Sequence, residues 1–236
     1  MIIKKFFWVF FAFFIFSCAA KQPAPTPEVL YKEAVEAAKS KDYLTSIESY
    51  KKVKELFPDH PLAQVAQLEI AESYFNSEQY DEAIMAYDEF VKLYPGNINI
   101  PYARFKEALC YFNQISQADR DQSSTRKAID KFEKIIKDFP DTPYAVKSYN
   151  YLKFCRKRLA EQEIFVANFY FKSGKYKAAE KRYFYVLKFF SDVEIQENAL
   201  LGLYNLYKTT GENTKAEEIK STLEFFFPYI LLSKNT

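Results

Sequence analysis

Residues 67–95, QLEIAESYFNSEQYDEAIMAYDEFVKLYP, contain two short apolar patterns with helical spacing, separated by the polar residues 76–79. The apolar positions that share a face are Ile70, Ala71 and Tyr74 in the first pattern and Ala83, Tyr87 and Phe90 in the second. Small side chains at Ala71 and Ala83 allow two helix axes to approach closely, while the aromatic rings fill the space beside that contact. The stretch therefore predicts a helical hairpin that ends at Pro95.

The signal that closes this hairpin, an aromatic residue followed by proline, recurs along the chain. Its five occurrences are Phe57-Pro58, Tyr94-Pro95, Phe139-Pro140, Phe190-Ser191, where serine replaces proline, and Phe227-Pro228. The successive spacings are 37, 45, 51 and 37 residues, and the extra length in the third unit is assigned to residues 116–125. A single hairpin cannot bury its apolar face, so such units must stack on one another.

This pattern resembles the tetratricopeptide repeat, and it predicts an all-α superhelix of about five helical hairpins. The fifth unit departs from the pattern by carrying Lys220 where an aromatic residue is expected, which is typical of a terminal cap. An irregular helical bundle with coincidental spacing is the alternative, and the five recurrences disfavour it. Residues 144–173 contain no helix breaker, so one long helix and two kinked helices both remain open there.

Composition excludes several classes of function. Only 4 glycines occur in 236 residues, which disfavours a β-rich fold and leaves no phosphate-binding loop. The single histidine, His60, lies between Asp59 and Pro61 at a helix end, and no partners for a catalytic triad or a zinc site accompany it. We therefore expect no enzyme activity, no metal and no cofactor. Cys110 and Cys155 lie in helical patterns, either as small buried residues or as a disulfide pair.

The N-terminal residues have the pattern of a bacterial lipoprotein leader. Lys4 and Lys5 precede an eleven-residue apolar run, 6–16, which is too short to span a bilayer. It leads into Ile15-Phe16-Ser17-Cys18, which resembles a lipobox and predicts acylation of Cys18. An ordinary secretory signal with an incidental cysteine is the alternative. Without Lys4 and Lys5, 31 basic residues face 31 acidic ones, which argues against a nucleic-acid partner.

The chain is thus divided into a lipoprotein signal peptide (1–17), a lipidated proline-rich linker (18–27) and a repeat solenoid (28–236). Alanine rather than aspartate follows Cys18, which favours the periplasmic face of the outer membrane. The alternating prolines of the linker favour extended polyproline geometry, which gives a reach of roughly 25 to 30 Å from the lipid.

A narrower resemblance lies in residues 118–170. They contain an Asp-Arg-Asp loop after the third unit's first helix, an aromatic-Pro-Asp stop, and Arg-Leu-Ala followed by a Val-Ala-x-x-Tyr helix. These features resemble the BamD (ComL) family, the tetratricopeptide lipoproteins of the outer-membrane β-barrel assembly machine. The resemblance implies a non-enzymatic scaffold that binds a POTRA domain of a BamA-type barrel protein, other assembly-machine lipoproteins and unfolded outer-membrane proteins. A tetratricopeptide lipoprotein serving cell-envelope or division machinery is the alternative.

The same resemblance supplies candidate contact residues. Lys188 falls where the family places a basic contact to the POTRA domain, although a lysine at a helix C-terminus also favours the helix dipole. Asp119, Arg120 and Asp121 form the inserted loop, either as partner contacts or as residues that order the loop itself. Independently of the resemblance, Tyr43 and Tyr80 are predicted to be exposed at turns, as candidates for contact with aromatic side chains of a substrate. A basic cluster at Lys153, Arg156, Lys157 and Arg158 is either a solvated helix face or a further contact.

Overall fold

A computed structural model describes residues 24–118 and 120–228 of the chain. The predicted signal peptide, Cys18 and Asp119 lie outside these residues. In the described part the chain forms ten helices and no strand. They are α1 (Pro27–Lys39), α2 (Tyr43–Leu56), α3 (Pro61–Asn76), α4 (Tyr80–Leu93), α5 (Ile100–Asn113), α6 (Ser123–Asp138), α7 (Pro143–Lys172), α8 (Tyr176–Phe189), α9 (Gln196–Thr210) and α10 (Asn213–Phe226).

Capping residues mark the starts of α1 and α3, and residues with positive φ form most of the turns within the hairpins. The Thr26 hydroxyl accepts a hydrogen bond from Val29 N, and Pro27 occupies the first position of α1. His60 acts as the N-cap of α3 through its ring nitrogen, which accepts from Leu62 N. Among the described residues, four hairpin turns pass through a residue with positive φ, and two of these four residues are glycine. These turn residues are Lys41, Glu78, Gly174 and Gly211.

Helix pairing follows the predicted pattern of small and large residues. The alanines at which paired helices meet are fully buried, namely Ala34, Ala71, Ala83, Ala108, Ala128, Ala167, Ala179 and Ala216. The large rings beside them are at most 1% exposed, namely Tyr50, Tyr87, Phe90, Phe132 and Tyr183. Consecutive helices pack against each other throughout, and α1 also contacts α3, α5 contacts α7, and α7 contacts α9. The prediction of about five stacked hairpins is confirmed.

Helix α7 resolves the open question over residues 144–173, because it is a single helix of 30 residues. Its first half packs with α5 and α6, where Cys155 joins a cluster that includes Phe105 and Phe132. Its second half, from Leu159 onward, belongs to the core shared with α8 and α9. Cys110 and Cys155 are free buried cysteines, so the disulfide alternative is wrong.

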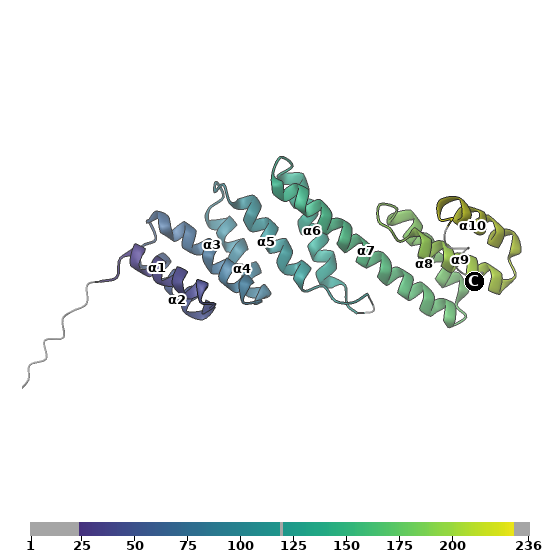
Figure 1. Cartoon of the computed structure of the whole chain (residues 1–236), viewed down its shortest axis with the longest axis horizontal. Helices are drawn as coiled ribbons and strands as arrows, with labels where there is room; N and C mark the ends of the chain where they lie inside the picture. Colours follow the sequence, from purple (N-terminus) through teal and green to yellow (C-terminus); the bar gives the residue numbers. More distant parts are fainter. Residues whose placement is uncertain (1–23, 119, 229–236) are drawn as a thin grey trace, which may run out of the picture.

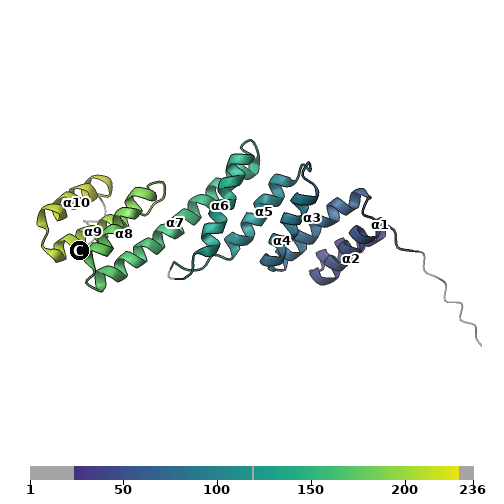
Figure 2. The ribbon, with the colours of Figure 1, turned by 180° about the vertical axis from the view of Figure 1, so that it is seen from behind.

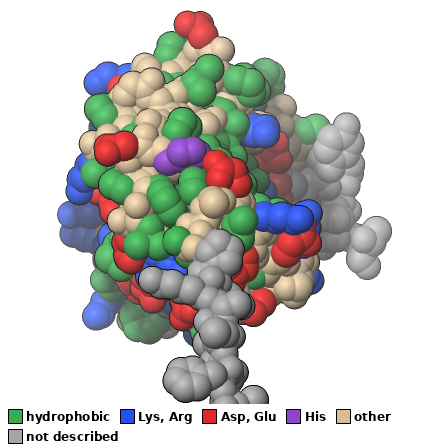
Figure 3. Space-filling model, turned by 90° about the vertical axis from the view of Figure 1, so that its left-hand side faces the viewer, with side chains coloured by type: hydrophobic (Ala, Val, Ile, Leu, Met, Phe, Trp, Pro, Cys, Tyr) green, Lys and Arg blue, Asp and Glu red, His purple; other side chains and the backbone are tan. Residues whose placement is uncertain are grey.

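The hairpins follow one another along an elongated body with α1 at one end and α10 at the other (Figure 1). The view from behind shows the same order (Figure 2). At the end that carries α1 and α2, hydrophobic and charged side chains are interspersed on the surface (Figure 3). Because the hairpins are arranged along one long axis, each long side of the solenoid carries side chains from several helices in chain order.

Candidate partner-binding surface

The outward face of α8 carries aromatic and basic side chains together. The inward face buries Ala179, Tyr183 and Val186. On the other side Phe184, Tyr185 and Phe189 are 45%, 43% and 48% exposed, and with Glu180, Lys181 and Lys188 they line a shallow hollow. Large aromatic side chains are enriched in protein interfaces relative to ordinary protein surface. We refer to Lys181, Phe184, Tyr185, Lys188 and Phe189 as the α8 surface.

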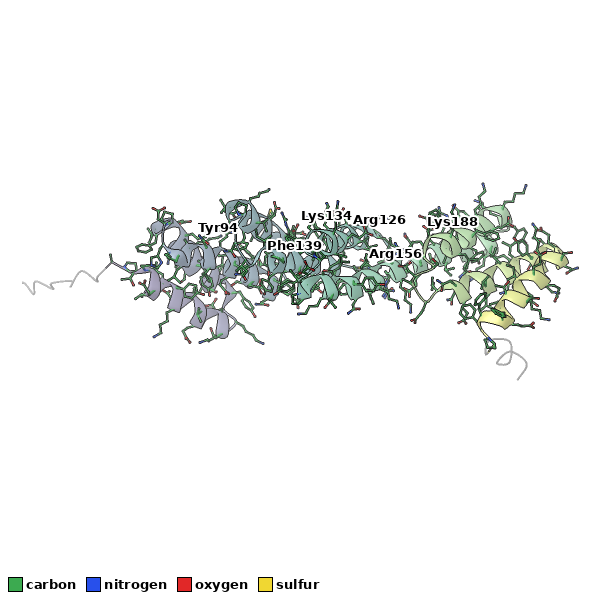
Figure 4. The ribbon with its side chains drawn as sticks, turned by 90° about the horizontal axis from the view of Figure 1, so that it is seen from above. Tyr94, Arg126, Lys134, Phe139, Arg156 and Lys188 are labelled. Atoms are coloured by element: carbon green, nitrogen blue, oxygen red, sulfur yellow. The ribbon has the colours of Figure 1, made fainter. Side chains whose placement is uncertain are left out.

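Lys188 lies at the end of the α8 surface that is closest to the next loop. It is exposed in the last turn of α8, and its ammonium lies 5.2 Å from the centre of the neighbouring Phe189 ring. Figure 4 shows Tyr94, Phe139, Arg156 and Lys188 succeeding one another along the long axis. A lysine in the last turn interacts favourably with the negative end of the helix dipole, and its exposed ammonium can also contact an acidic group of a partner. Both interpretations of Lys188, as a helix-end residue and as a partner contact, therefore fit the geometry.

Arg156 of α7 fixes the C-terminal end of α8 and the loop behind it. Its Nε donates to Asp192 Oδ2 at 2.6 Å, and its Nη2 donates to Asp192 Oδ1 and to the Phe189 carbonyl, both at 2.7 Å. These hydrogen bonds hold the pKa of Asp192 below its usual value and raise the pKa of Arg156. The two hydrogen bonds from the Arg156 guanidinium to the Asp192 carboxylate restrict rotation of both side chains, and the bond to Phe189 fixes the C-terminal end of α8. We refer to these three bonds as the Arg156 clamp.

The predicted basic cluster on α7 is therefore mostly engaged within the chain. Besides Arg156, Lys153 lies 3.6 Å from Glu194, and Arg158 donates to Glu161 at 2.9 Å. Lys157 lines a small hollow with Phe154 and Glu194. Two of the four, Lys153 and Arg156, thus connect α7 to the loop between α8 and α9, whereas Arg158 pairs within α7. The sequence carried no signal for the Arg156–Asp192 pair because its members lie 36 positions apart.

The inserted loop of the third unit is ordered by its own side chains. Gln122 is 2% exposed, and its amide nitrogen donates to the carbonyl oxygens of Gln117 and Arg120 at 2.8 and 3.1 Å. Asp121 accepts a hydrogen bond from the Ser123 hydroxyl, which lowers the pKa of the carboxyl. Arg120 and Asp121 are exposed, so contact with a partner remains a prediction for both. Asp119 lies outside the described residues.

Tyr43 and Tyr80 begin α2 and α4, at the turns where they were predicted. The prediction that they are exposed is wrong, because both are partly buried. The Tyr80 ring packs edge-on against Phe75, with 5.8 Å between ring centres. The structure places neither of them beside the α8 surface, because they belong to the first two hairpins.

A second feature, which sequence reasoning missed, is a hollow of about 740 Å³ lined by residues of α4, α5 and α6. Beside it Glu107 is almost fully buried, and its carboxylate accepts from Lys131 at 2.5 Å and from Arg104 at 2.8 Å. Arg104 also donates to Asp88 at 3.0 Å. The network joins three helices through one buried carboxylate. Nothing in the local pattern distinguishes Glu107 from a solvent-exposed glutamate.

Two features are absent from the described residues. Across residues 24–118 and 120–228, no three His, Cys, Asp or Glu side chains are grouped as metal ligands would be. Within the same ranges no helix combines the length and the apolar character that crossing a bilayer requires. The fold and its exposed aromatic and basic face define the class: a tetratricopeptide-type solenoid whose candidate site is a binding surface.

Comparisons with known proteins identify the family. The YfiO family, described as an outer membrane lipoprotein, matches residues 23–223, and the chain belongs to this family, which includes the BamD proteins. An outer membrane protein assembly factor BamD of Rickettsia prowazekii is 32% identical over 199 residues, covering 84% of this chain and 79% of that protein. The protein of the same name from Caulobacter vibrioides is 28% identical, covering 89% and 72% of the two chains.

A solved structure agrees on the fold alone. The tetratricopeptide-repeat domains of yeast Sti1 superpose with a TM-score of 0.51 at 16% identity, covering 86% of this chain and 78% of that one. Family membership rests instead on the match over residues 23–223 and on the BamD relatives, which confirm the resemblance seen in residues 118–170.

Proposed function

We propose that this protein is a scaffold for the assembly and insertion of outer membrane proteins, held at the periplasmic face of the outer membrane by acylated Cys18. The observation that carries the proposal is the family match over residues 23–223, together with relatives named outer membrane protein assembly factors. A stack of hairpins with exposed lateral faces suits this role, because it holds other polypeptides without chemistry of its own. We propose no enzymatic step.

The α8 surface is the proposed docking site for a POTRA domain of a BamA-type barrel protein. Its aromatic rings supply contact area, and Lys188 supplies a charge that attracts an acidic group on the partner. The Arg156 clamp supports this proposal because it fixes the end of α8 before the partner arrives, which lowers the entropy cost of binding. Other assembly-machine lipoproteins and unfolded outer-membrane proteins are proposed to bind the remaining faces of the solenoid.

Charge reversal at Lys188 tests the docking site. Lys188→Glu should reduce recovery of a BamA-type protein when the lipoprotein is isolated from outer membranes in mild detergent, and it should weaken binding to the purified POTRA region by about tenfold. Lys208→Glu is the matched control, because Lys208 is also exposed in the last turn of a helix, α9. Equal recovery with both variants would contradict the assignment of the α8 surface.

The alternative role in division or envelope machinery makes a different prediction. Depletion of this protein should lower the amount of folded porins in the outer membrane if it assists barrel assembly. Septation defects with normal porin levels would instead indicate the alternative. The names of the relatives favour the first outcome.

A further inference from the structure

The hollow of about 740 Å³ between the second and third hairpins has the dimensions of a binding site. Its lining comes from the end of α4, the loop of residues 95–98, the start of α5 and the second half of α6. Pockets that bind ligands have volumes of about 300–1,000 Å³. We refer to it as the α4–α6 hollow. It is separate from the α8 surface, because α8 contributes no residue to its lining.

The rim of the α4–α6 hollow presents apolar side chains on an ordered loop. Ile98 is 92% exposed and lines the hollow together with Phe139. The Asn97 side chain accepts a hydrogen bond from Asn99 N at 2.8 Å and donates one to Gln64 Oε1 of α3 at 3.3 Å. These bonds order the loop while Ile98 stays in water. A partner that covered Ile98 and Phe139 would therefore remove apolar area from water without having to order the loop.

The floor of the α4–α6 hollow carries two cations that one buried carboxylate holds in place. The Glu107 side chain is 2% exposed and accepts hydrogen bonds from Arg104 Nη1 and Lys131 Nζ. Arg104 also donates to Asp88 through the same Nη1, so its Nε and Nη2 have no partner among the described residues. Within the same part of the chain, Lys131 has no acceptor besides Glu107. Both cations line the hollow, and their remaining N–H groups can serve an acceptor placed in it.

A carboxylate is the acceptor that these donors fit. The guanidinium of arginine matches a carboxylate with two parallel N–H groups, and the ammonium of lysine adds a further charged donor. The side chains of Arg104 and Lys131 are only 29% and 27% exposed, so an ion pair formed with them is screened less by salt than one on the open surface. The floor therefore selects for a carboxylate, and the rim selects for apolar groups beside it.

The charges on the α6 side of the rim favour a polypeptide over a free acid or a lipid. Lys134 and Asp138 both line the hollow, and Lys134 is paired only through an exposed contact with Asp130. Figure 4 shows Lys134 and Phe139 in the central part of the solenoid. An extended peptide presents backbone N–H and C=O groups to charges of both signs. A fatty acid or a phosphate headgroup has no N–H to donate to Asp138, and its own negative charge would repel that carboxylate.

We propose that the α4–α6 hollow binds an extended segment of another protein in which an aspartate or glutamate lies between apolar residues. Arg104 and Lys131 hold the carboxylate, and Ile98 and Phe139 cover the apolar side chains. Because the lining comes from two successive hairpins, the bound segment bridges the second and third units of the solenoid. This site is independent of the proposed docking of a POTRA domain on the α8 surface.

The test measures fluorescence polarisation of labelled peptides with the full chain in detergent micelles, and micelles without protein give the background. Two pools of C-terminally amidated heptapeptides serve as probes. In one pool a central glutamate has leucine, isoleucine, valine or phenylalanine on each side and serine or glycine elsewhere, and in the other pool glutamine replaces the glutamate. The glutamate pool should bind about tenfold more tightly, because only a charged acceptor pairs with Arg104 and Lys131.

Two variants with matched controls locate the binding. Ile98→Ser should weaken binding of the glutamate pool about tenfold and keep the helical circular dichroism, because Ile98 belongs to none of the three core clusters. Leu44→Ser is its control, since Leu44 of α2 is 70% exposed and lies outside the hollow. Lys131→Gln should reduce the preference for glutamate over glutamine. Its control is Lys137→Gln, on the same helix but outside the lining.

A preference for the glutamate pool that Lys131→Gln reduces, together with weaker binding by Ile98→Ser and unchanged binding by both controls, supports the proposal. Equal binding of the two pools by the wild type overturns it, and so does equal binding of the glutamate pool by Ile98→Ser and the wild type. Saturable binding of dodecanoate that Ile98→Ser weakens, without binding of either peptide pool, also overturns it, because the hollow would then take a lipid acid.

Discussion

Replacing Gly202 by alanine tests how closely α9 packs on the fourth hairpin. A methyl group at Gly202 would lie 2.8 Å from Cδ1 of Tyr183 and closer still to Cε1 and Cζ of the same ring. That ring cannot move aside easily, because Tyr183 is 1% exposed and its hydroxyl donates to Asn168 at 2.6 Å. Alanine at this position therefore overpacks a contact between two helices.

The expected magnitude combines two opposing effects. Overpacking a well-filled contact costs about 1–3 kcal/mol, whereas alanine gains about 1 kcal/mol over glycine inside a helix. The net loss of unfolding free energy is therefore up to about 2 kcal/mol, which corresponds to a Tm lower by up to roughly 8 °C for a chain of this size. Thermal unfolding followed by circular dichroism at 222 nm, where helices absorb, measures this change.

Two further variants make the result decisive. Gly96→Ala is the control, because no atom lies within 4 Å of the added methyl group, and it should change stability by less than about 0.5 kcal/mol. In a Tyr183→Leu background Gly202→Ala should be neutral or stabilising, because the ring that it strikes is gone. If Gly202→Ala lowered the Tm equally in both backgrounds, the proposed clash with the Tyr183 ring would be refuted.

Three other changes test separate parts of the structure. Glu107→Gln should lower the unfolding free energy by about 2 kcal/mol in denaturant titration, because two cations lose a buried carboxylate, whereas Asp130→Asn in an exposed ion pair should leave the midpoint unchanged. Asp192→Asn should lower the Tm near pH 7. Because Arg156 holds the pKa of Asp192 below its usual value, the wild type should lose this advantage as the pH falls through that lowered pKa, and the two Tm values should converge in acid. Cys18→Ala should release the protein from membranes on fractionation, and retention like that of the wild type would contradict acylation.

The repeat architecture could be predicted from sequence because its determinants are local and periodic. Ala71 and Ala83 together with Tyr87 specify a close hairpin through size alone, and the same sizes recur in the other units. The length of α7 could not be predicted, because periodicity without a breaker does not distinguish a straight helix from a kinked one. The structure provides the missing information through packing, since α7 is held by α6 over its first half and by α8 over its second.

Less of the candidate site than of the fold could be predicted from the sequence. Lys188 was chosen from a family resemblance, whereas the exposed aromatic rings around it depend on which face of α8 is buried. The roles of Arg156 and Glu107 arise from partners on other helices, at distances along the chain that no local pattern encodes. For Tyr80 the prediction of exposure is wrong, because its position at a turn does not reveal that Phe75 packs against its ring.

The unbroken course of α7 has a mechanical consequence. A helix of 30 residues is about 45 Å long, and α7 packs into two hydrophobic core clusters along that length. Rotation of the fourth hairpin relative to the third would have to bend α7 or disrupt one of these two cores. We therefore expect the third and fourth hairpins to move together as one unit, because a single helix is packed into the cores of both.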